Sequence, residues 1–574
     1  MSKEIILFKK ELSDWLIIRF KKCFDVNIIN AEISSTNNEK FGDFQSNVSL
    51  SNSKKLKLTP RDISNRIINT KNIPSFVEKI EIAGPGFINF TIKNNSISNN
   101  LEFLIKDECL GVNQVGKNKN IIIDYSSPNV AKPMHIGHIR STVIGNALDR
   151  LYRFQGYNVI ADNHLGDWGT QFGLMIIGFR EYVDNKALNI SPIDELERIY
   201  VKSYNRSKED NEWKQLAKKE LVKLQQGDKN NLDLWNSFVK LSLDEFEKIY
   251  KRLDIKFDLF RGESFYNNLL PDIISKLEEK NLIKESEGAK VVDLEEQGMP
   301  VCIVEKSDGG FNYTTTDLAT VVSRQKEFSP EKIIYVTDER QQLHFKQFFQ
   351  VSKMLGLNDN LKHVWFGLMR LPEATFSTRE GNVIKLSDLL DEAEKRALKI
   401  IRSSNSDLDE KKQLELAKAI GIGAIKYMDL SQNPQSLVTF TWDKALSLDG
   451  NSAPYLQYAY ARISSVYDKY KEKYNLEKLE KNNINISEII ERRLAIKLLK
   501  FPDAINAATE NYKPNILCDY LYELSQLYSS YYQNLPFLKA EEGIRESRIK
   551  ICSLTAKILK KGLYLLGIRT PERI

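Results

Sequence analysis

Cysteine and histidine are both scarce in this chain of 574 residues, with five of each. The cysteines, at positions 23, 109, 302, 518 and 552, are widely spaced and form no CxxC pair. This spacing argues against a disulfide framework and against a zinc knuckle. A reducing compartment is therefore the expected setting.

Long apolar runs and a strong excess of charge are also missing. No apolar run approaches the roughly 20 residues that a membrane-spanning helix needs, and residues 1–4 carry no signal-peptide pattern, so we expect a cytoplasmic protein without membrane contact. Lys and Arg number 83 against 77 Asp and Glu, a formal net charge of +6. This balance fits local contact with polyanions in a chain that is not basic throughout.

Apolar periodicity divides the chain into four regions. Residues 1–110 mix helical patterns with strands and a Gly-Pro-Gly turn, which predicts a small α+β module suited to binding. Residues 111–400 follow an α/β pattern, interrupted from about 180 to 285 by charged amphipathic helices, so we expect a parallel-sheet domain with a helical insertion. Residues 401–454 read as a connecting helical region, and residues 455–574 as a helical domain.

Two later apolar runs in the α/β region are expected to continue the parallel sheet. They are Val-Cys-Ile-Val at residues 301–304 and Ile-Ile-Tyr-Val at residues 333–336. A polar turn and a helical pattern follow each run, as in repeated strand–helix units.

The most informative segment is residues 133–142, where a predicted strand at residues 121–123 hands over to a predicted helix. His135 and His138 are three residues apart, so they share one face of the opening turn. They lie beside N–H groups that lack partners within the helix and beside the positive end of its dipole. Gly137 leaves the backbone open to a ligand. The pattern predicts a nucleotide phosphate site, and the alternative is a pair of surface histidines on an ordinary helix.

Residues 126–138 (Ser-Ser-Pro-Asn-Val-Ala-Lys-Pro-Met-His-Ile-Gly-His) closely resemble the HIGH signature of class I aminoacyl-tRNA synthetases, in the extended form of the arginyl-tRNA synthetase family. Four further segments are similar to that family in the same order: GPGFINF at 84–90, GDWGTQFG at 166–173, GESFY at 262–266 and NSAPYLQY at 451–458. The resemblance covers almost the whole chain, and this ordered set is far more specific than the HIGH motif alone.

The resemblance implies a multidomain α/β fold. Its catalytic domain would be a Rossmann-like parallel sheet of the HUP type with a helical insertion. A small α+β N-terminal domain would bind tRNA, and an all-α C-terminal domain would bind the anticodon. This family has no editing domain, and the chain shows no segment that resembles one.

The resemblance also implies the reaction. ATP would activate L-arginine to arginyl-adenylate, releasing pyrophosphate, and the arginine would then pass to the 3′ end of tRNA(Arg). Neither step needs a covalent enzyme nucleophile, so catalysis rests on positioning and preorganised positive dipoles. His135, Gly137 and His138 match the ATP-binding residues of the family. Mg²⁺ would accompany the nucleotide, although the sequence shows no carboxylate cluster dedicated to it. The family resemblance also implies a monomer.

Recognition of arginine makes a separate demand, because a planar, permanently charged guanidinium requires carboxylates in a fork geometry. The resemblance aligns the following residues with arginine-side-chain ligands: Asp124, Tyr313, Asp317 and Gln341. Asn129 and His135 would hold the α-amino and carboxylate end. The alternative for Asp317 is a helix N-cap, and for Asp124 a turn cap. The family usually has Glu at the position of Asp124, one methylene longer.

The second signature loop departs from the class pattern, which is KMSKS. Here Thr375 and Thr378 stand where lysines are expected, and Ser377 and Arg379 remain as ATP-binding candidates. Some members of the family are thought to recover the lost charge with a lysine just upstream of HIGH, and Lys132 matches that position. A cation so close to the phosphate site is electrostatically useful. The alternative is a solvated turn lysine.

Four more residues are active-site candidates. His164 and His344 each follow a predicted strand, so both should face the crevice at the carboxyl ends of the sheet. Gly166 and Asp167 share the segment of His164. For either histidine the alternative is a neutral structural role, and His363, which lies in no motif, is expected to be structural.

Aromatic and basic residues of the helical domain are candidates for tRNA contact. The stacking candidates are Tyr455, Tyr458, Arg462, Tyr528 and Tyr532, and Ile574 stands where the family has a terminal methionine. Aromatic rings stack on splayed bases of single-stranded RNA loops. The alternative is a helix-bundle core with tyrosines at its rim. Basic residues of the last predicted helix would contact phosphates: Arg545, Arg548, Lys550, Lys557, Lys560 and Lys561.

Three functions therefore compete. The favoured one is arginine–tRNA ligase. A second is another HIGH-type nucleotidyltransferase or a different class I synthetase, although Asp124 together with Asp317 argues against an apolar substrate. The third is a catalytically inactive tRNA-binding relative, for which only the missing loop lysines speak.

Overall fold

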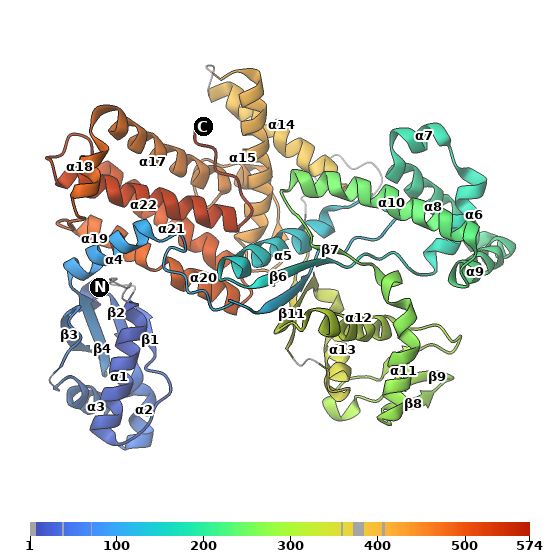
Figure 1. The fold of residues 1–574 in the computed structure, drawn as a ribbon, viewed down its shortest axis with the longest axis horizontal. Helices are drawn as coiled ribbons and strands as arrows, with labels where there is room; N and C mark the ends of the chain where they lie inside the picture. Colours follow the sequence, from blue (N-terminus) through green and yellow to red (C-terminus); the bar gives the residue numbers. More distant parts are fainter. Residues whose placement is uncertain are drawn as a thin grey trace.

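The computed structural model describes residues 7–36, 39–69, 72–357, 360–370, 384–404 and 408–573. Figure 1 shows a small N-terminal unit in blue, a central α/β domain with a helical arm, and a helical domain in orange and red. Within the described ranges, no helix combines the length and apolar character that a bilayer span requires.

The N-terminal unit is an antiparallel sheet packed against helices, as the sequence predicts. The strand order is β1-β2-β4-β3. Its elements are α1 (Phe8–Phe24), β1 (Ile33–Ser35), β2 (Phe44–Ser46), α2 (Val48–Leu56), α3 (Pro60–Ile68), β3 (Val77–Ala83) and β4 (Phe87–Ile92). The turn between β3 and β4 needs glycine, because Gly86 has φ +143° and a Cβ there would lie 2.7 Å from the backbone of Pro60.

The α/β domain is built on five parallel strands in the order β12-β11-β5-β6-β7. The strands are β5 (Asn120–Asp124), β6 (Asn158–Asn163), β7 (Leu259–Phe260), β11 (Lys332–Asp338) and β12 (Leu361–Phe366). Ile121 and Ile123 pack on the face of the sheet that helix α5 (Ile136–Phe154) covers, whereas Ile122 belongs to the core on the opposite face of the sheet. Burial on both faces explains the uninterrupted isoleucine run.

One predicted strand is wrong in its placement. Residues 302–305 form β10 (Cys302–Glu305), which pairs antiparallel with β9 (Ala289–Val292) in a separate sheet that also contains β8 (Ile283–Ser286). The β8–β9 hairpin turns at Glu287 and Gly288, both with positive φ, which is the geometry that favours a tight hairpin. Local pairing therefore takes this run out of the parallel sheet.

Helices cover both faces of the parallel sheet, and a separate set of helices forms the arm at the right of Figure 1. The covering helices are α5 (Ile136–Phe154), α11 (Leu270–Glu279), α12 (Tyr313–Phe328) and α13 (Gln342–Met354). The arm comprises α6 (Gln171–Tyr182), α7 (Asn185–Ile190), α8 (Pro192–Glu209), α9 (Asn211–Gln225) and α10 (Lys229–Arg252). Because β7 rejoins the sheet just after α10, the helical insertion ends near residue 252 and not near 285.

The remaining helices fall into three groups. α4 (Asn94–Lys106) follows the N-terminal sheet, and three helices connect the α/β domain to the helical domain: α14 (Leu386–Ser404), α15 (Glu410–Leu430) and α16 (Trp442–Ala445). The helical domain consists of α17 (Ala453–Lys473), α18 (Leu476–Lys481), α19 (Ile489–Leu499), α20 (Phe501–Glu510), α21 (Asn515–Asn534) and α22 (Ile544–Leu565). The buried guanidinium of Arg140 in α5 pairs with Asp429 in α15 at 2.6 Å. Lys426, also buried in α15, donates to the carbonyl oxygens of Leu253 and Gly567. These contacts fix α5 relative to the helical domain.

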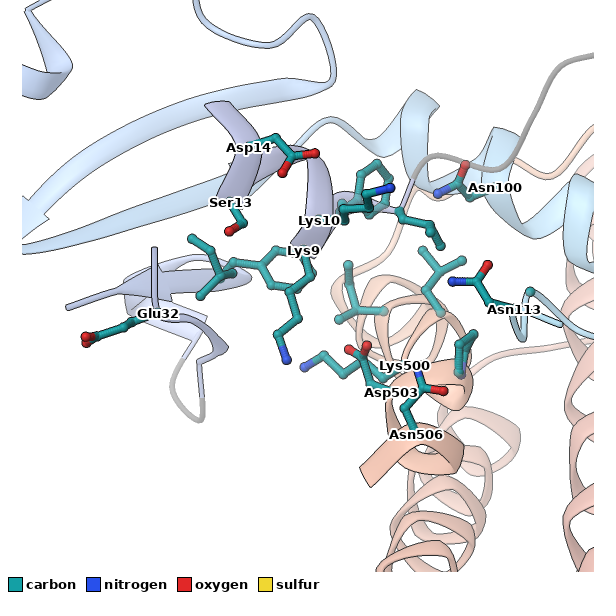
Figure 2. A pocket seen from close by; sticks show the side chains of 18 of the residues that line it. Lys9, Lys10, Ser13, Asp14, Glu32, Asn100, Asn113, Lys500, Asp503 and Asn506 are labelled. Atoms are coloured by element: carbon teal, nitrogen blue, oxygen red, sulfur yellow. The ribbon is translucent and has the colours of Figure 1, made fainter. Parts of the chain in front are cut away.

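A cavity of about 420 Å³ lies where the N-terminal unit meets the helical domain. Figure 2 shows Lys9 and Lys10 of α1 facing Lys500 and Asp503 at the start of α20 across this space. Its lining residues include none from the signature segments. The cavity is thus a junction between units and lies apart from the residues that carry the chemistry.

Candidate active site

His135 and His138 cap the N-terminus of α5 with their own side chains. The Nδ1 atom of His135 accepts from the Gly137 N–H at 3.0 Å, and the Nδ1 atom of His138 accepts from the His135 N–H at 3.1 Å. This reciprocal arrangement is a capping box made of two imidazoles, with ring centroids 4.0 Å apart. Gly137 is required because a Cβ there would lie 2.8 Å from the His135 ring.

The capping contacts fix the protonation of both imidazoles. A neutral imidazole nitrogen that accepts a hydrogen bond carries no proton, so each proton sits on Nε2. Burial lowers the pKa of His138 to about 3. Burial and the charges of Lys132 and Arg340 also lower the pKa of His135. Near neutral pH both side chains are therefore uncharged, and each presents an Nε2–H donor.

The N–H groups of the opening turn are already occupied, contrary to the sequence prediction. Ile136 donates to the carbonyl of Ile384 at 3.1 Å, Gly137 donates to the His135 ring, and the His138 N–H donates to the His135 carbonyl at 2.8 Å. The donors left for a ligand are the two imidazole Nε2–H groups, in the field of the helix dipole.

The second signature loop itself cannot be compared with the prediction. Thr375, Ser377, Thr378 and Arg379 lie outside the described residues, as does Ile574. Residues 384 and 385, which follow the loop, are described, and Lys385 forms an isolated antiparallel bridge with His135. The chain after the loop therefore lies directly beside the histidines.

At the carboxyl end of β5, Asp124 is buried and already holds a guanidinium. Its Oδ2 lies 2.6 Å from Nη2 of Arg324, a fully buried residue of α12. The same nitrogen lies 2.8 Å from Oδ2 of Asp162, the register neighbour of Asp124 on β6. Ser127 Oγ donates to the other oxygen of Asp124 at 3.1 Å. Asp124 is thus an ion-pair partner and not the turn cap considered above.

Asp317 faces a histidine and does not cap a helix. α12 begins at Tyr313 with Asn312 as N-cap, so Asp317 lies in the second turn and the N-cap interpretation is wrong. Its Oδ2 is 2.6 Å from Nε2 of His344. Burial lowers the pKa of His344, but the hydrogen bond and charge of Asp317 outweigh burial, so the pKa is raised. His344 thus holds the carboxylate of Asp317 through a hydrogen bond.

A third carboxyl group, not singled out by sequence reasoning, completes this acidic pocket. Burial raises the pKa of Glu263 to about 8, and the charges of Asp317 and Asp167 contribute in the same direction. The pKa of Tyr313, an exposed residue, is also raised, by desolvation of its hydroxyl and by the charge of Glu263. Glu263 belongs to the GESFY segment, so its signal was present in the sequence; Asp162 and Arg324 lay in no motif.

Asp167 positions the loop that carries Glu263. One carboxylate oxygen accepts from the Ser264 N–H at 2.9 Å, and the other accepts from Ser264 Oγ at 2.6 Å. The approach is so close that a Cβ on Gly262 would lie 2.2 Å from the Asp167 carboxyl carbon. Asp167 therefore anchors this loop with both of its oxygens.

The remaining predicted residues line the same edge of the sheet. Asn129 bridges to Gly166, where a Cβ would lie 2.1 Å from the Asn129 side-chain oxygen. The His164 ring lies 5.6 Å from that of Tyr266. Gln341 is exposed, one residue before α13.

Among the tRNA candidates, an exposed cluster forms between α17 and α21. The Arg462 guanidinium lies 5.7 Å from the Tyr458 ring centroid and 5.4 Å from that of Tyr532. Tyr455 is half-buried against Tyr522. Tyr528 is only 1% exposed and its hydroxyl meets Cys552, so the prediction that it stacks on bases is wrong: it belongs to the core.

Most basic residues of α22 also serve the fold. Arg548 pairs with Glu491 at 2.8 Å, and Lys550 pairs with Glu102 of α4 at 2.9 Å. Two further residues, Arg545 and Lys557, are likewise in ion pairs. Among the described residues only Lys560 and Lys561 of this set pair with no carboxylate and instead lie over aromatic rings. The predicted row of phosphate contacts is therefore mostly wrong.

A parallel sheet that presents imidazole donors at the helix following its central strand, next to a separate helical domain, is the arrangement expected of a class I aminoacyl-tRNA synthetase. Models of known families match nearly the whole chain: "tRNA synthetases class I (R), catalytic domain" over residues 100–442, "DALR anticodon binding domain" over 456–574 and "Arginyl tRNA synthetase N terminal domain" over 7–92. The chain belongs to the arginyl-tRNA synthetase family.

Individual relatives agree with this assignment. The arginine–tRNA ligase of Fusobacterium nucleatum is 46% identical over 539 residues, covering 94% of both chains. That of Trichodesmium erythraeum is 44% identical over 566 residues, covering 94% of this chain and 95% of its own. The crystal structure of arginyl-tRNA synthetase from Plasmodium falciparum superposes with a TM-score of 0.86 at 28% identity and covers all of both chains.

Proposed function

We propose that this protein is an arginine–tRNA ligase whose two substrate sites are the imidazole pair of α5 and the acidic pocket beside α12. The imidazole pair would take the ATP phosphates, and the pocket would take the arginine side chain. The observation that carries the proposal is the placement of two neutral Nε2–H donors and of the Asp317–Glu263 pair along one edge of the parallel sheet, where ligands of such folds bind.

At the phosphate end, His135 and His138 supply donors without charge. As the arginine carboxylate attacks the α-phosphorus, negative charge grows on the phosphate oxygens and on the departing pyrophosphate. Donors fixed in advance stabilise that charge at no cost of reorganisation, and the capping contacts hold both rings in place. Lys132 lies on the turn before α5 and raises the local positive potential.

At the arginine end, Asp317 and Glu263 would bind the guanidinium and Tyr313 would cover it. His344 would orient the Asp317 carboxylate through the hydrogen bond between its Nε2 atom and Oδ2 of Asp317. Asp124 keeps acceptor capacity for the substrate, because an ionised carboxylate has about four lone-pair sites and only two are used here. Asn129 and His135 would hold the α-amino and carboxylate end, with Gln341 at the entrance.

The other partners follow from the flanking units. The Tyr458–Arg462–Tyr532 cluster would meet the anticodon loop, and the N-terminal unit would bind elsewhere on tRNA. Mg²⁺ would arrive with ATP: in the described part of the chain no three His, Cys, Asp or Glu side chains are grouped to hold a metal. All five cysteines are free, which fits work in a reducing cytoplasm, and we propose a monomer.

ATP–pyrophosphate exchange tests this function. Each amino acid is assayed with and without tRNA, because this family tends to need tRNA before it activates arginine. We expect exchange with arginine when tRNA is present. Exchange with a different amino acid, or none with arginine and tRNA together, would contradict the proposal.

A further inference from the structure

Helix α8 of the insertion engages two lysines that neighbour the histidine pair: Lys132, three residues before His135, and Lys385, which forms a bridge with His135. Lys132 Nζ lies 4.8 Å from the Tyr200 ring centroid. Lys385 Nζ lies 2.6 Å from Oδ1 of Asp194. Tyr200 and Asp194 belong to the same helix, so one element holds both lysines.

Lys385 lies next to His135. The two residues oppose each other in an antiparallel bridge, and Leu386 extends the pairing by donating its N–H to the Met134 carbonyl at 2.8 Å. Side chains of directly opposed residues project to the same side with their Cβ atoms about 5 Å apart. The Lys385 side chain therefore starts beside the imidazole that faces the phosphates.

The α8 surface opposite these lysines is negative. Asp194, Glu197 and Tyr200 follow each other at three-residue intervals and span about 9 Å of helix. Burial raises the pKa of Glu197, and the charges of Lys385 and Lys132 act against it. Glu197 forms no ion pair with either lysine among the described contacts, but the charges of both lysines act on it.

We propose that Lys385 binds the ATP triphosphate and that Asp194 holds this lysine while no nucleotide is bound. Lys385 then provides positive charge that Thr375 and Thr378 do not supply in the second signature loop. A triphosphate carries several negative charges against the single charge of Asp194, so it competes for the ammonium group. The inference rests on the proposed function, since it concerns the same ATP site.

Binding of ATP therefore breaks the ion pair that joins α8 to Lys385. Asp194 keeps its other contact, a hydrogen bond from Ser191 Oγ at 2.7 Å, so α8 itself stays intact. The insertion thereby senses whether the ATP site is filled. Asp194 acts only through Lys385, which makes it a positioning residue and Lys385 a substrate-binding one.

Three variants test the idea: Lys385→Met, Asp194→Asn and the double variant. In arginine- and tRNA-dependent pyrophosphate exchange, Lys385→Met should raise the KM for ATP about tenfold, the worth of a lost charge-assisted hydrogen bond. The KM for arginine should stay unchanged, and Lys385→Arg should restore most of the ATP affinity. Asp194→Asn should lower the KM for ATP by about two- to fivefold, because an exposed ion pair no longer competes.

The double variant is decisive, because Asp194→Asn must no longer lower the KM for ATP once Lys385 is replaced by Met. Lys395→Met on α14 and Asp244→Asn on α10 are matched controls, as both side chains are exposed and distant in sequence from the bridge. An unchanged KM for ATP in Lys385→Met, equal rises for ATP and arginine, or a gain from Asp194→Asn that persists in the double variant would overturn the proposal.

Failure of the proposed function gives a different result. Wild-type protein would then show no arginine-dependent exchange at all. ATP affinity would in that case be measured by equilibrium dialysis on the same variants, and we expect the variants to show the same order of ATP affinities. An order in which Lys385→Met binds ATP as tightly as wild type would refute the role of Lys385 independently of arginine.

Discussion

Replacing His138 by asparagine separates the two roles of this imidazole, which are to accept the His135 N–H at Nδ1 and to donate a hydrogen bond from Nε2. The Asn side-chain oxygen stands near the position of Nδ1, so it can still accept the His135 N–H, which His138 now accepts at 3.1 Å. The donor at Nε2 is lost. We therefore expect His138→Asn to leave the free energy of unfolding within about 0.5 kcal/mol of wild type, since loss of the cap itself would cost about 1 kcal/mol.

The expected loss of rate is much larger. A preorganised donor to developing charge is worth about 100- to 1000-fold in rate, or about 3–4 kcal/mol. His138→Gln is the complementary variant, because its amide N–H reaches toward the Nε2 position. It should retain more activity than His138→Asn.

Single-turnover adenylate formation with arginine and tRNA measures the rate, and urea denaturation measures stability. The pKa of His138 is lowered to about 3, so its protonation contributes no change in rate between about pH 6 and 8. The reasoning is refuted if His138→Asn forms adenylate at the wild-type rate. It is equally refuted if that variant loses more than about 2 kcal/mol of stability, because the imidazole would then be mainly structural.

Three further predictions concern the pocket and its support. Asp317→Asn should raise the KM for arginine by about tenfold or more while leaving the KM for ATP unchanged in pyrophosphate exchange; equal effects on both substrates would argue against a side-chain ligand. Because the pKa of Glu263 is raised to about 8, its carboxyl group ionises as pH rises through that value. Arginine affinity, measured by calorimetry, should therefore increase from about pH 7 to 9, and Glu263→Gln should lose this dependence. An identical pH profile in the variant and the wild type would exclude Glu263 from arginine binding. Asp429→Ala leaves the Arg140 guanidinium buried without its carboxylate and should cost about 3–5 kcal/mol in urea denaturation, whereas a loss below about 1 kcal/mol would show that the pair is solvated.

The outline of the fold was accessible from sequence because it depends on local periodicity. The isoleucine run of β5 and the helical spacing after Ile139 predict a buried strand and the helix that follows it, and the structure has both. The placement of β10 was not accessible. An apolar run reads alike in a parallel sheet and in an antiparallel one, and here the run pairs with β9, the strand that precedes it in the chain.

Partners distant in sequence explain most of the other differences. The sequence shows Asp124 at the end of a strand, but the guanidinium that it binds comes from Arg324, 200 positions later. Likewise, helical spacing puts Tyr528 and Tyr532 on one side of α21 without telling which of them is covered. Packing of α22 buries the first, through Cys552, and leaves the second partly exposed.

The His135 N–H and the Gly137 N–H illustrate a subtler limit. The spacing of the two histidines predicted a phosphate site, and the dipole argument predicted free backbone donors there. The structure gives those backbone donors to the imidazole Nδ1 atoms. Side-chain capping competes with ligand binding for the same N–H groups, and only coordinates reveal which of the two prevails.

The most direct measurement is aminoacylation of tRNA. The protein is incubated with ATP, L-arginine and tRNA, the tRNA is digested with nuclease, and the terminal nucleoside is identified by mass spectrometry. Our account predicts arginyl-adenosine that depends on ATP. Its absence, with tRNA that the Fusobacterium nucleatum arginine–tRNA ligase does charge, would contradict the account.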